Sequence, residues 1–489
     1  MLFNSHIFLF AFLPVVLAGY FLLGTTRWNR FANVWLAVAS LVFYGWWNIR
    51  YLPLLVGSIL ANYCLTGAVL HFRRQGRLAP QRIAFWSGIA FNLAMLGYYK
   101  YTDFLISAVN SAFGAQLPLL HVILPLGISF FTITQILALI DCHEGVAKEH
   151  DFVNYALFVS FFPHLMAGPI LYHRPMMKQF ADAALRRPQT GNLAMGASLF
   201  ILGLAKKLLI ADSFIAPVAW GFSNAATLDF AQGWLSVLCY MMQLYFDFSG
   251  YSDMAVGLAR MMNIEIPVNF RHPFHATSVA NFWQRWHISL TNAITACVYM
   301  PLVRALGRGS RPTFVHTLIA AAIAFFLVGI WHGAGWTFVA FAALQSAGIA
   351  VCQAWKHCHL HIAPLLGRAL TMLFVCVSFV YFRAPDLRTA KAMLGAMFGH
   401  HGIHLPTDAA IAITPYVGHA LPPMGTIPGL PVAVLCIALL LVIFSPDANG
   451  IIKHIEAHPR AIYAVLLAVL FLISVLHLAQ PSMFLYFQF

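Results

Sequence analysis

Long apolar runs separated by short polar connections form most of this chain. A helix needs about 20 apolar residues to cross a bilayer. The runs that meet or approach this length are Ile7–Leu23, Phe31–Trp47, Tyr51–Leu70, Ile83–Tyr99, Ile123–Ile140, Leu193–Ala211, Phe230–Phe248, Thr313–Trp331, Trp336–Ala354, Ala369–Phe382, Leu430–Phe444 and Ile462–Leu478. They predict an all-α polytopic membrane protein with roughly twelve transmembrane helices. We interpret residues 1–489 as a single integral membrane domain, with N-terminal helices over 1–140, a core over 141–355, and C-terminal helices over 356–489 that include an external loop at 383–429.

Two stretches depart from this pattern. Phe152–Leu171 is apolar, but prolines and a glycine interrupt it between Pro163 and Pro169. Irregular backbone at membrane depth is tolerated where it is buried in protein or lines a wet cavity, so we expect a re-entrant hairpin there. The stretch Arg260–Arg311 is too polar to span and too aromatic for a free loop. Within it, we expect Asn281–Leu290 to be a helix on or partly in the cytoplasmic interface.

The composition agrees with a membrane protein. Of the 489 residues, 61% are hydrophobic and only 9% are charged, whereas soluble domains carry about 25% charged residues. The net charge of +13 would suggest nucleic-acid binding in a soluble chain, but here Lys and Arg lie in short connections between apolar runs, where the positive-inside rule explains them. With the basic connections at 27–30 and 73–82 in the cytoplasm, both termini are expected outside. Eight dispersed cysteines, without a Cys-x-x-Cys pair, indicate neither a disulfide frame nor a thiolate metal site.

One histidine interrupts an apolar hairpin. The run Phe325–Trp336 contains His332 between Trp331 and the step Gly333–Gly335, and a second apolar run follows at once. An ionisable side chain at membrane depth is costly, and such residues usually line a cavity or a pathway. A neutral imidazole also has the basicity to take a proton from an attacking hydroxyl. His332 is therefore a candidate general base; the alternative is a histidine hydrogen-bonded inside a helix bundle or resting at the lipid interface.

Further polar side chains lie among apolar ones, and the basic members suit an anionic, phosphate-bearing donor. These residues are His287, Arg285, Asp247, Asp253, Lys206, Lys207 and His164. The sequence contains no Gly-x-Ser-x-Gly, Walker, dinucleotide-binding or His-Glu-x-x-His motif. Two histidine-rich segments, 357–361 and 400–404, raise metal binding as an alternative. No second ligand cluster with standard spacing accompanies them, so no metal is predicted.

An ordered set of motifs resembles the membrane-bound O-acyltransferase (MBOAT) superfamily, and more closely the bacterial branch that includes the membrane subunit for alginate O-acetylation. The matching stretches are Leu2–Ser5, Phe161–Pro163 with Ala167–Ile170, Lys206–Lys207 with Ala211–Asp212, Tyr245–Asp253, Asn269–Phe270, Phe282–Trp283 with Arg285–Leu290, Trp331–Gly333 and Phe484–Phe489. The set extends over essentially the whole chain. It implies a funnel-shaped helical membrane enzyme that takes an acyl group from a cytoplasmic thioester donor, with acetyl-CoA as the expected donor and no tightly bound cofactor.

The resemblance also implies roles for individual residues. His332 matches the essential histidine of the family and His287 its second characteristic polar position, so both are expected to be catalytic. The residues expected to bind the donor or line a tunnel are Trp331, Trp283, Arg285, Trp286, Asp247, Asp253, Lys206, Lys207 and His164.

The resemblance further implies a location and partners. The chain is expected in the bacterial inner membrane with both termini periplasmic. In this branch the acyl group usually passes to a periplasmic SGNH-hydrolase-like partner, which completes transfer to an exported polysaccharide. Alginate is the leading acceptor; peptidoglycan, cellulose and D-alanyl transfer to teichoic acid are alternatives on the same scaffold. A transporter is a further alternative, although the breaks at Pro163–Pro169 and His332–Gly335 lack the paired symmetry typical of transporters. The last alternative is a scaffold protein without catalytic activity.

Overall fold

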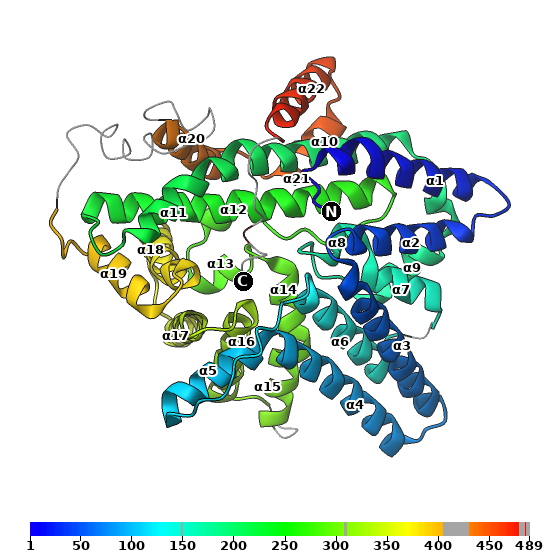
Figure 1. Cartoon of the computed structure of the whole chain (residues 1–489), viewed down its shortest axis with the longest axis horizontal. Helices are drawn as coiled ribbons and strands as arrows, with labels where there is room; N and C mark the ends of the chain where they lie inside the picture. The colour runs from blue at the N-terminus through cyan, green and yellow to red at the C-terminus, as the bar shows by residue number, and fades with distance from the viewer. Residues whose placement is uncertain (148–149, 308–310, 404–429, 479–484, 486–489) are drawn as a thin grey trace. The chain divides into compact units, whose positions relative to one another are not determined.

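The computed structural model describes residues 1–147, 150–307, 311–403, 430–478 and 485 of the chain. The described residues form helices joined by short connections, and no strand occurs among them (Figure 1). The all-α prediction is therefore confirmed. The chain divides into two compact units, residues 1–200 with 252–268 and residues 201–251 with 269–489, and each is described by itself. The single-domain organisation stays a prediction.

The first unit holds the N-terminal helices, coloured blue to cyan in Figure 1. They are η1 (Phe8–Phe12), α1 (Leu13–Thr25), α2 (Phe31–Gly45), η2 (Ile49–Tyr51), α3 (Leu52–Arg74), α4 (Leu78–Leu96), η3 (Gly97–Tyr101), α5 (Thr102–Phe113), α6 (Ile128–Glu144), α7 (Phe152–Ser160), α8 (Phe162–Leu165), α9 (His173–Ala181) and η4 (Ala183–Arg186). α3 and α4 pack together, and the buried Asn92 amide donates to Asn62 Oδ1 at 2.6 Å between them. Buried polar groups need such partners, so the amide pair fixes how these two apolar helices meet.

The expected break inside Phe152–Leu171 is present. α7 ends at Ser160, Phe161 leaves the helical conformation, and the four-residue α8 follows with Pro163 in its first turn. Proline is tolerated there because the first N–H groups of a helix have no intrahelical partner. The stretch from Phe161 to Leu171 is buried inside the first unit. The side of the membrane from which this segment enters stays a prediction.

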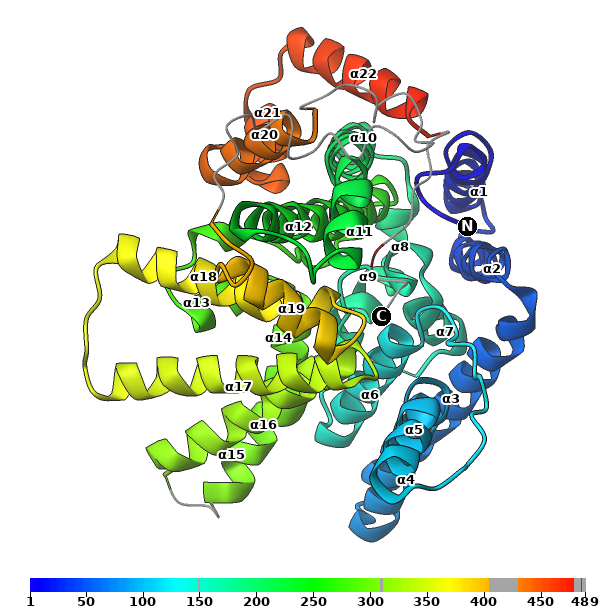
Figure 2. The same ribbon diagram turned by 60° about the vertical axis from the view of Figure 1, so that its left-hand side comes forward.

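The second unit holds the remaining helices. They are η5 (Lys206–Ala211), η6 (Asp212–Phe214), α11 (Ile215–Ser223), η7 (Pro273–His275), α13 (Val279–Trp283), α14 (Ile288–Ile294), η8 (Thr295–Tyr299), α15 (Met300–Gly307), α16 (Phe314–His332), α17 (Trp336–His357), α18 (Pro364–Arg383), α19 (Leu387–Met397), α20 (Leu430–Phe444), α21 (Ala448–Ala457) and α22 (Ala461–Leu476). Two further helices, α10 (Thr190–Ala205) and α12 (Phe230–Met261), have residues in both units. α16 and α17 lie side by side as a hairpin, and α17 also packs on α18 (Figure 2).

The α16–α17 hairpin owes its close packing to local sequence. Thr313 caps α16: its hydroxyl accepts from the N–H of His316, and its own N–H donates to the His316 ring. Near the other end of α16, a Cβ added at Gly329 would collide with the backbone of Ala342 on α17. The two helices can therefore approach this closely only with glycine at position 329.

The expected twelve crossings are not confirmed. Among the described residues, seven helices are long and apolar enough to span a membrane, or eight if the bent pair Val432–Phe444 and Ala448–Ala457 is one span. The seven are Phe8–Thr25, Ile49–Arg74, Thr190–Ser223, Ile288–Gly307, Phe314–His332, Trp336–His357 and Pro364–Arg383. Two predicted crossings, Phe31–Gly45 and Ala461–Leu476, are apolar but shorter than a full span. The chain is a multi-pass membrane protein.

Two sequence expectations for individual segments were wrong. The stretch Arg260–Arg311 contains a continuous helix, Ile288–Gly307, that is long and apolar enough to cross. The interfacial helix expected over Asn281–Leu290 is broken, because α13 ends at Trp283 and α14 begins only after His287. The external location of the segment 383–429 stays a prediction. Its described part includes helix α19, with Asp386 accepting from the N–H of Thr389 as its cap; residues 404–429 lie outside the described part of the chain.

Candidate active site

His332 is the last residue of α16 and is buried, with 4% of its surface exposed. The helix ends here because Gly333 adopts an extended conformation, and α17 starts three residues later at Trp336. A Cβ at Gly333 would collide with the ring of Phe338. The tight turn after α16 therefore depends on glycine and holds the imidazole inside the second unit.

The His332 ring is enclosed by aromatic side chains. Its centroid lies 5.1 Å from both Phe382 and Trp331 and 6.3 Å from Phe341. A small cavity beside it has a volume of about 10 Å³ and is lined by His332, Leu244, Phe248, Trp283, Trp286, Phe341, Phe379 and Phe382. A cavity of this size holds about one water molecule. We call this the His332 pocket; in this conformation it is closed to anything larger.

His287 lies at the start of α14 in a left-handed backbone conformation, with φ of 47°. Two backbone hydrogen bonds hold the turn: the Ile288 N–H donates to the Asn269 carbonyl at 3.0 Å, and the Arg271 N–H donates to the Arg285 carbonyl at 2.9 Å. A non-glycine residue in this region is uncommon, and such residues gather at functional sites. The left-handed conformation of His287 is what breaks the helix that sequence periodicity predicts over 281–290.

The hydrogen bond of the His287 ring defines its tautomer. Nδ1 lies 3.2 Å from Asn269 Oδ1, and the same oxygen accepts from the Ser289 hydroxyl at 2.7 Å and from the Ser289 N–H at 3.2 Å. Because that oxygen is already an acceptor, Nδ1 donates and the basic nitrogen is Nε2. His287 precedes the span that begins at Ile288, and burial lowers its pKa to about 3. The ring is therefore neutral at physiological pH.

The two candidate histidines are neighbours. Their ring centroids are 6.3 Å apart, and Phe248 meets the His287 ring edge-on at 4.8 Å. The sequence separates these residues by 45 positions, but α14 and α16 bring them together in the second unit. One neutral imidazole of defined tautomer and one imidazole in an aromatic pocket can share proton transfer to and from a small substrate.

Two of the tryptophans expected at the site belong to the pocket wall. Trp283 and Trp286 line the His332 pocket. The Trp283 indole donates to Gln345 Oε1 at 3.0 Å, and the Gln345 amide donates in turn to the Ser378 hydroxyl at 2.9 Å. This buried chain ties α13 to α17 and α18 and so orients the pocket wall.

The remaining expected site residues are not brought into the His332 pocket. Arg285 is only half-buried and donates to Asn281 Oδ1 at 3.1 Å. Lys206 lines a different cavity of the second unit. Asp253 and His164 belong to the first unit, where both are buried and His164 Nε2 lies 2.9 Å from the Phe158 carbonyl. Their roles in donor binding stay predictions.

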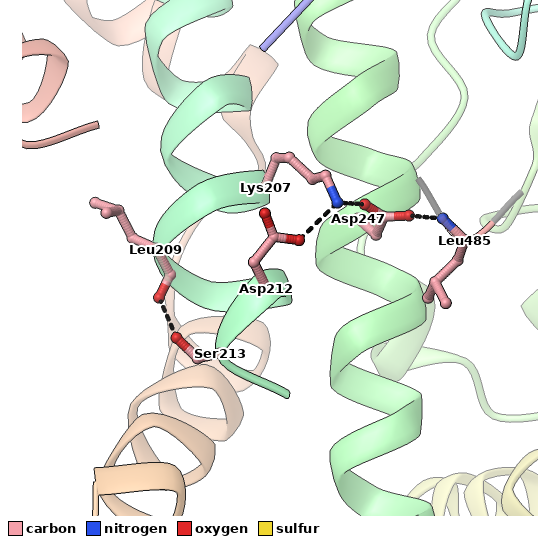
Figure 3. A network of polar contacts seen from close by, with 6 residues as sticks. All are labelled: Lys207, Leu209, Asp212, Ser213, Asp247 and Leu485. Carbon is pink, nitrogen blue, oxygen red and sulfur yellow. Dashed lines mark hydrogen bonds and ion pairs between the residues drawn. The ribbon is translucent and has the colours of Figure 1, made fainter. Parts of the chain in front are cut away.

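Lys207 forms a buried ion-pair network inside the second unit (Figure 3). Its Nζ lies 2.6 Å from Asp212 Oδ1 and 2.7 Å from Asp247 Oδ1, and the side chains of all three residues are at most 9% exposed. Asp247 Oδ2 accepts from the backbone N–H of Leu485 at 2.9 Å. A buried cation between two carboxylates is strongly constrained, so the network links η5 and α12 to the C-terminal segment through Leu485.

Metal binding finds no support in the described part of the chain, where no group of three or more His, Cys, Asp or Glu side chains is arranged to hold an ion. This covers the histidine-rich segment at 357–361 and residues 400–403 of the second such segment. His404 lies outside the described residues.

The residues that complete the site carry little local sequence signal. Phe341, Phe379 and Phe382 close the pocket, but in the sequence they are ordinary apolar residues of membrane helices. Asn269 was one of the matched motif residues, yet its bond to His287 depends on a turn that sequence periodicity did not predict.

A family model describes the chain as membrane-bound O-acyltransferase, MBOAT, and matches residues 58–388. The chain belongs to the MBOAT family. This chain is therefore an acyltransferase, and both His287 and His332 fall within the matched region.

Three relatives indicate the range of acyl transfer in this family. The peptidoglycan O-acetyltransferase of Helicobacter pylori is 38% identical over 84% of this chain and 82% of that protein. The probable alginate O-acetylase AlgI of Pseudomonas putida is 34% identical over the full length of both chains. The teichoic acid D-alanyltransferase of Streptococcus thermophilus is 28% identical over 47% of this chain and 57% of that protein.

Proposed function

We propose that this MBOAT protein moves acetyl groups from a cytoplasmic acetyl-CoA-type donor across the inner membrane for O-acetylation of an exported polysaccharide, with alginate as the leading acceptor. The observation that carries the proposal is the pair of buried imidazoles, His332 in an aromatic pocket and His287 with its proton on Nδ1. A separate periplasmic SGNH-like acetyltransferase subunit completes the transfer in this proposal.

The chemistry assigned to His332 is general base catalysis. The imidazole accepts the proton of the attacking hydroxyl while the hydroxyl oxygen bonds to the acetyl carbonyl carbon. Collapse of the tetrahedral species breaks the carbon–sulfur bond, and the proton passes from the imidazole to the departing thiolate. His287, kept neutral by burial, accepts or donates a hydrogen bond during these proton movements. The reaction yields one ester and one thiol for each thioester.

The closed His332 pocket requires movement before reaction. Its volume of about 10 Å³ cannot admit an acetyl thioester, so the aromatic rings of Phe382, Phe341 or Trp286 must turn aside when the donor enters. The small volume of the resting pocket limits the water beside His332, which is useful because water competes with the acceptor hydroxyl for the thioester.

The acceptor polymer has two leading candidates. Full-length similarity to the probable alginate O-acetylase of P. putida supports alginate. The higher identity to the peptidoglycan O-acetyltransferase of H. pylori supports peptidoglycan as the second candidate. Shorter and weaker similarity to a teichoic acid D-alanyltransferase places D-alanyl transfer behind both.

Acetyl analysis in cells tests this proposal. The gene is deleted and complemented with the natural chain, His332→Ala, His287→Ala or His361→Ala, the last being an exposed control histidine. Acetyl ester is then measured separately in the exported alginate and in the peptidoglycan, with each protein quantified in the membrane. We expect the natural chain and His361→Ala to restore acetylation of one polymer and His332→Ala to restore none. Full restoration by His332→Ala would refute its catalytic role, and undiminished acetylation with His287→Ala would leave that residue only a structural role.

A further inference from the structure

A second cavity lies in the same unit as the His332 pocket but shares no lining residue with it. It has a volume of about 290 Å³ and is walled by the η5 region, α12, the η7 segment and the helices α20, α21 and α22. The helices α20, α21 and α22, which contribute to this wall, lie near one another in Figure 2. Sites for small ligands start at about 300 Å³, so this cavity is large enough for part of an organic molecule. The acyl-transfer steps written above use none of its lining residues, although Lys206 is also one of the residues expected to bind the donor.

Most of the cavity wall is hydrocarbon. The apolar lining includes Leu202, Leu209, Ile210, Phe246, Leu441 and Leu470. Leu209 and Ile210 belong to the π-helix η5, and π-helical segments frequently occur at functional sites. A wall of this kind binds an alkyl chain. At about 30 Å³ for each water molecule, the cavity volume of about 290 Å³ equals that of roughly ten water molecules.

Three of the lining side chains are polar groups that carry or can carry charge. Lys206 brings an ammonium group, and His272 and Asp447 bring an imidazole and a carboxylate. His272 Nε2 lies 3.7 Å from Asp447 Oδ2, while Asp447 Oδ1 accepts from the Gly450 N–H at 2.7 Å as the cap of α21. One carboxylate oxygen is thus engaged by the helix, and the other faces the histidine side of the cavity. The lining therefore includes residues of both signs of charge.

His272 and Asp447 both lie at helix ends. His272 sits in the polar connection between α12 and η7, and Asp447 sits where α20 and α21 meet at a bend of 62°. The His275 ring, 3.0 Å from the Ile443 carbonyl, fastens η7 to the end of α20. Polar connections and helix ends belong at the membrane interface, where lipid headgroups lie. The apolar part of the cavity then extends toward the hydrocarbon.

We propose that this cavity is a binding site for a phospholipid with an ammonium-bearing, zwitterionic headgroup, such as phosphatidylethanolamine. Lys206 and His272 contact the phosphate, Asp447 accepts hydrogen bonds from the headgroup ammonium, and one acyl chain lies along Leu209, Leu441 and Leu470. Basic pockets between membrane helices bind lipid headgroups, and the added carboxylate selects a headgroup that also carries a donor cation. This inference is independent of the proposed acyl transfer.

Lipid selectivity of two conservative variants tests the site. The full chain is placed in mixed micelles with equal phosphatidylethanolamine, phosphatidylcholine and diacylglycerol, and the retained lipids are counted by mass spectrometry of the intact complex. Loss of a hydrogen bond to a charged group changes affinity by about tenfold or more. The natural chain is therefore expected to retain phosphatidylethanolamine about tenfold over phosphatidylcholine, whose ammonium has no N–H to donate.

The variants separate the two ends of the headgroup. Asp447→Asn keeps a good helix cap for α21 but is expected to abolish the preference for ethanolamine over choline. Lys206→Met is expected to reduce both phospholipids to the level of diacylglycerol, and Lys391→Met, exposed on α19, keeps the natural profile. Equal retention of all three lipids by the natural chain, or an unchanged preference in Asp447→Asn, would overturn the proposal. So would full displacement of lipid by millimolar soluble phosphoethanolamine, since the acyl chain would then add nothing.

A crosslinking measurement on the natural chain covers variants that fail to fold. Phosphatidylethanolamine carrying a photoreactive group in its acyl chain is crosslinked to the protein, and the labelled peptides are identified. Labels within 202–210 and 441–451 support the site. Labels found exclusively on other peptides would refute it.

Discussion

His332 and His287 are both buried imidazoles, but their surroundings prepare them for different tasks. The oxygen of Asn269 that accepts the hydrogen bond from His287 Nδ1 also accepts two hydrogen bonds from Ser289, so the His287 ring has one orientation and one tautomer. His332 is instead held by aromatic rings of α16, α17 and α18. With a rigid, neutral imidazole beside a reactive one, the proton can move between groups that are already in the site.

The lowered pKa of His287 predicts a pH-dependent stability. The pKa falls from the ordinary value near 6.5 to about 3 in the folded chain, because burial disfavours the charged ring. The unfolded chain then binds one more proton below pH 6.5, so this stability is present above pH 6.5 and is lost as the pH falls toward 3. Between pH 7.5 and 5, the loss amounts to about 2 kcal/mol.

The His287→Asn variant isolates this contribution. Asparagine tolerates the left-handed backbone conformation at position 287 and does not titrate. We expect the free energy of unfolding in mild detergent to fall between pH 7.5 and 5 by about 2 kcal/mol less in His287→Asn than in the natural chain. An identical pH dependence in both proteins would mean that His287 is not held neutral by burial.

At the scale of elements, the sequence located most apolar helices and the break before Pro163, but not the break at His287. Phe314–His332 and Trp336–His357 agree closely with the runs predicted over 313–331 and 336–354. The break at His287 was missed because it depends on pairing with the distant Asn269–Arg271 segment. The continuation of α12 to Met261, beyond the predicted end at Phe248, was missed because Asp247 and Asp253 are buried in the protein.

The α16–α17 hairpin makes a prediction about glycine. An added methyl group at Gly329 meets the backbone of Ala342, which cannot move without separating the helices. We expect Gly329→Ala to destabilise the folded chain by about 1–3 kcal/mol, as overpacking does. Gly57→Ala on α3 is the matched control, since nothing lies within 4 Å of its added Cβ and alanine favours the helix. Thermal unfolding in detergent distinguishes the two; equal midpoints would show that α16 and α17 are packed less closely.

The Lys207 network makes a prediction about η5 and α12. Removing one partner of a buried ion pair leaves an uncompensated charge and costs about 3–5 kcal/mol. Lys207→Met leaves the buried carboxylates of Asp212 and Asp247 without their cation, so we expect it to lower the free energy of unfolding by that amount. Lys391→Met removes an exposed charge and is expected to change the free energy of unfolding by at most about 0.5 kcal/mol. Stability equal to the natural chain in Lys207→Met would mean that the network does not hold η5 against α12.

At the scale of the whole molecule, sequence motifs were sufficient for the family and for the fold class. The motif set from Lys206 to Gly333 lies within the region 58–388 that the family model matches. The number of crossings was not predictable from apolar runs, because an apolar run does not fix where the helix within it ends: the run Phe31–Trp47 holds a helix that stops at Gly45. The aromatic rings that close the His332 pocket also escaped prediction, since Phe341, Phe379 and Phe382 look like ordinary apolar residues of the membrane helices α17 and α18.

The direction of acetyl transfer across the membrane is also a property of the whole molecule. The acetyl donor is expected on the cytoplasmic face and the acceptor on the opposite one, so transfer is a property of the intact, inserted chain. Inside-out membrane vesicles present the cytoplasmic face to the medium, which lets labelled acetyl-CoA reach the chain from the expected side.

Transfer of labelled acetyl from external acetyl-CoA to the polysaccharide fraction of such vesicles is the most direct test of the central claim. We predict transfer by the natural chain and by the control His361→Gln. We predict a rate about 10²- to 10⁴-fold lower in His332→Gln, the usual loss when a general base is removed, with equal amounts of folded protein in each membrane. Transfer by His332→Gln at the natural rate would contradict the assignment of His332 as the catalytic base.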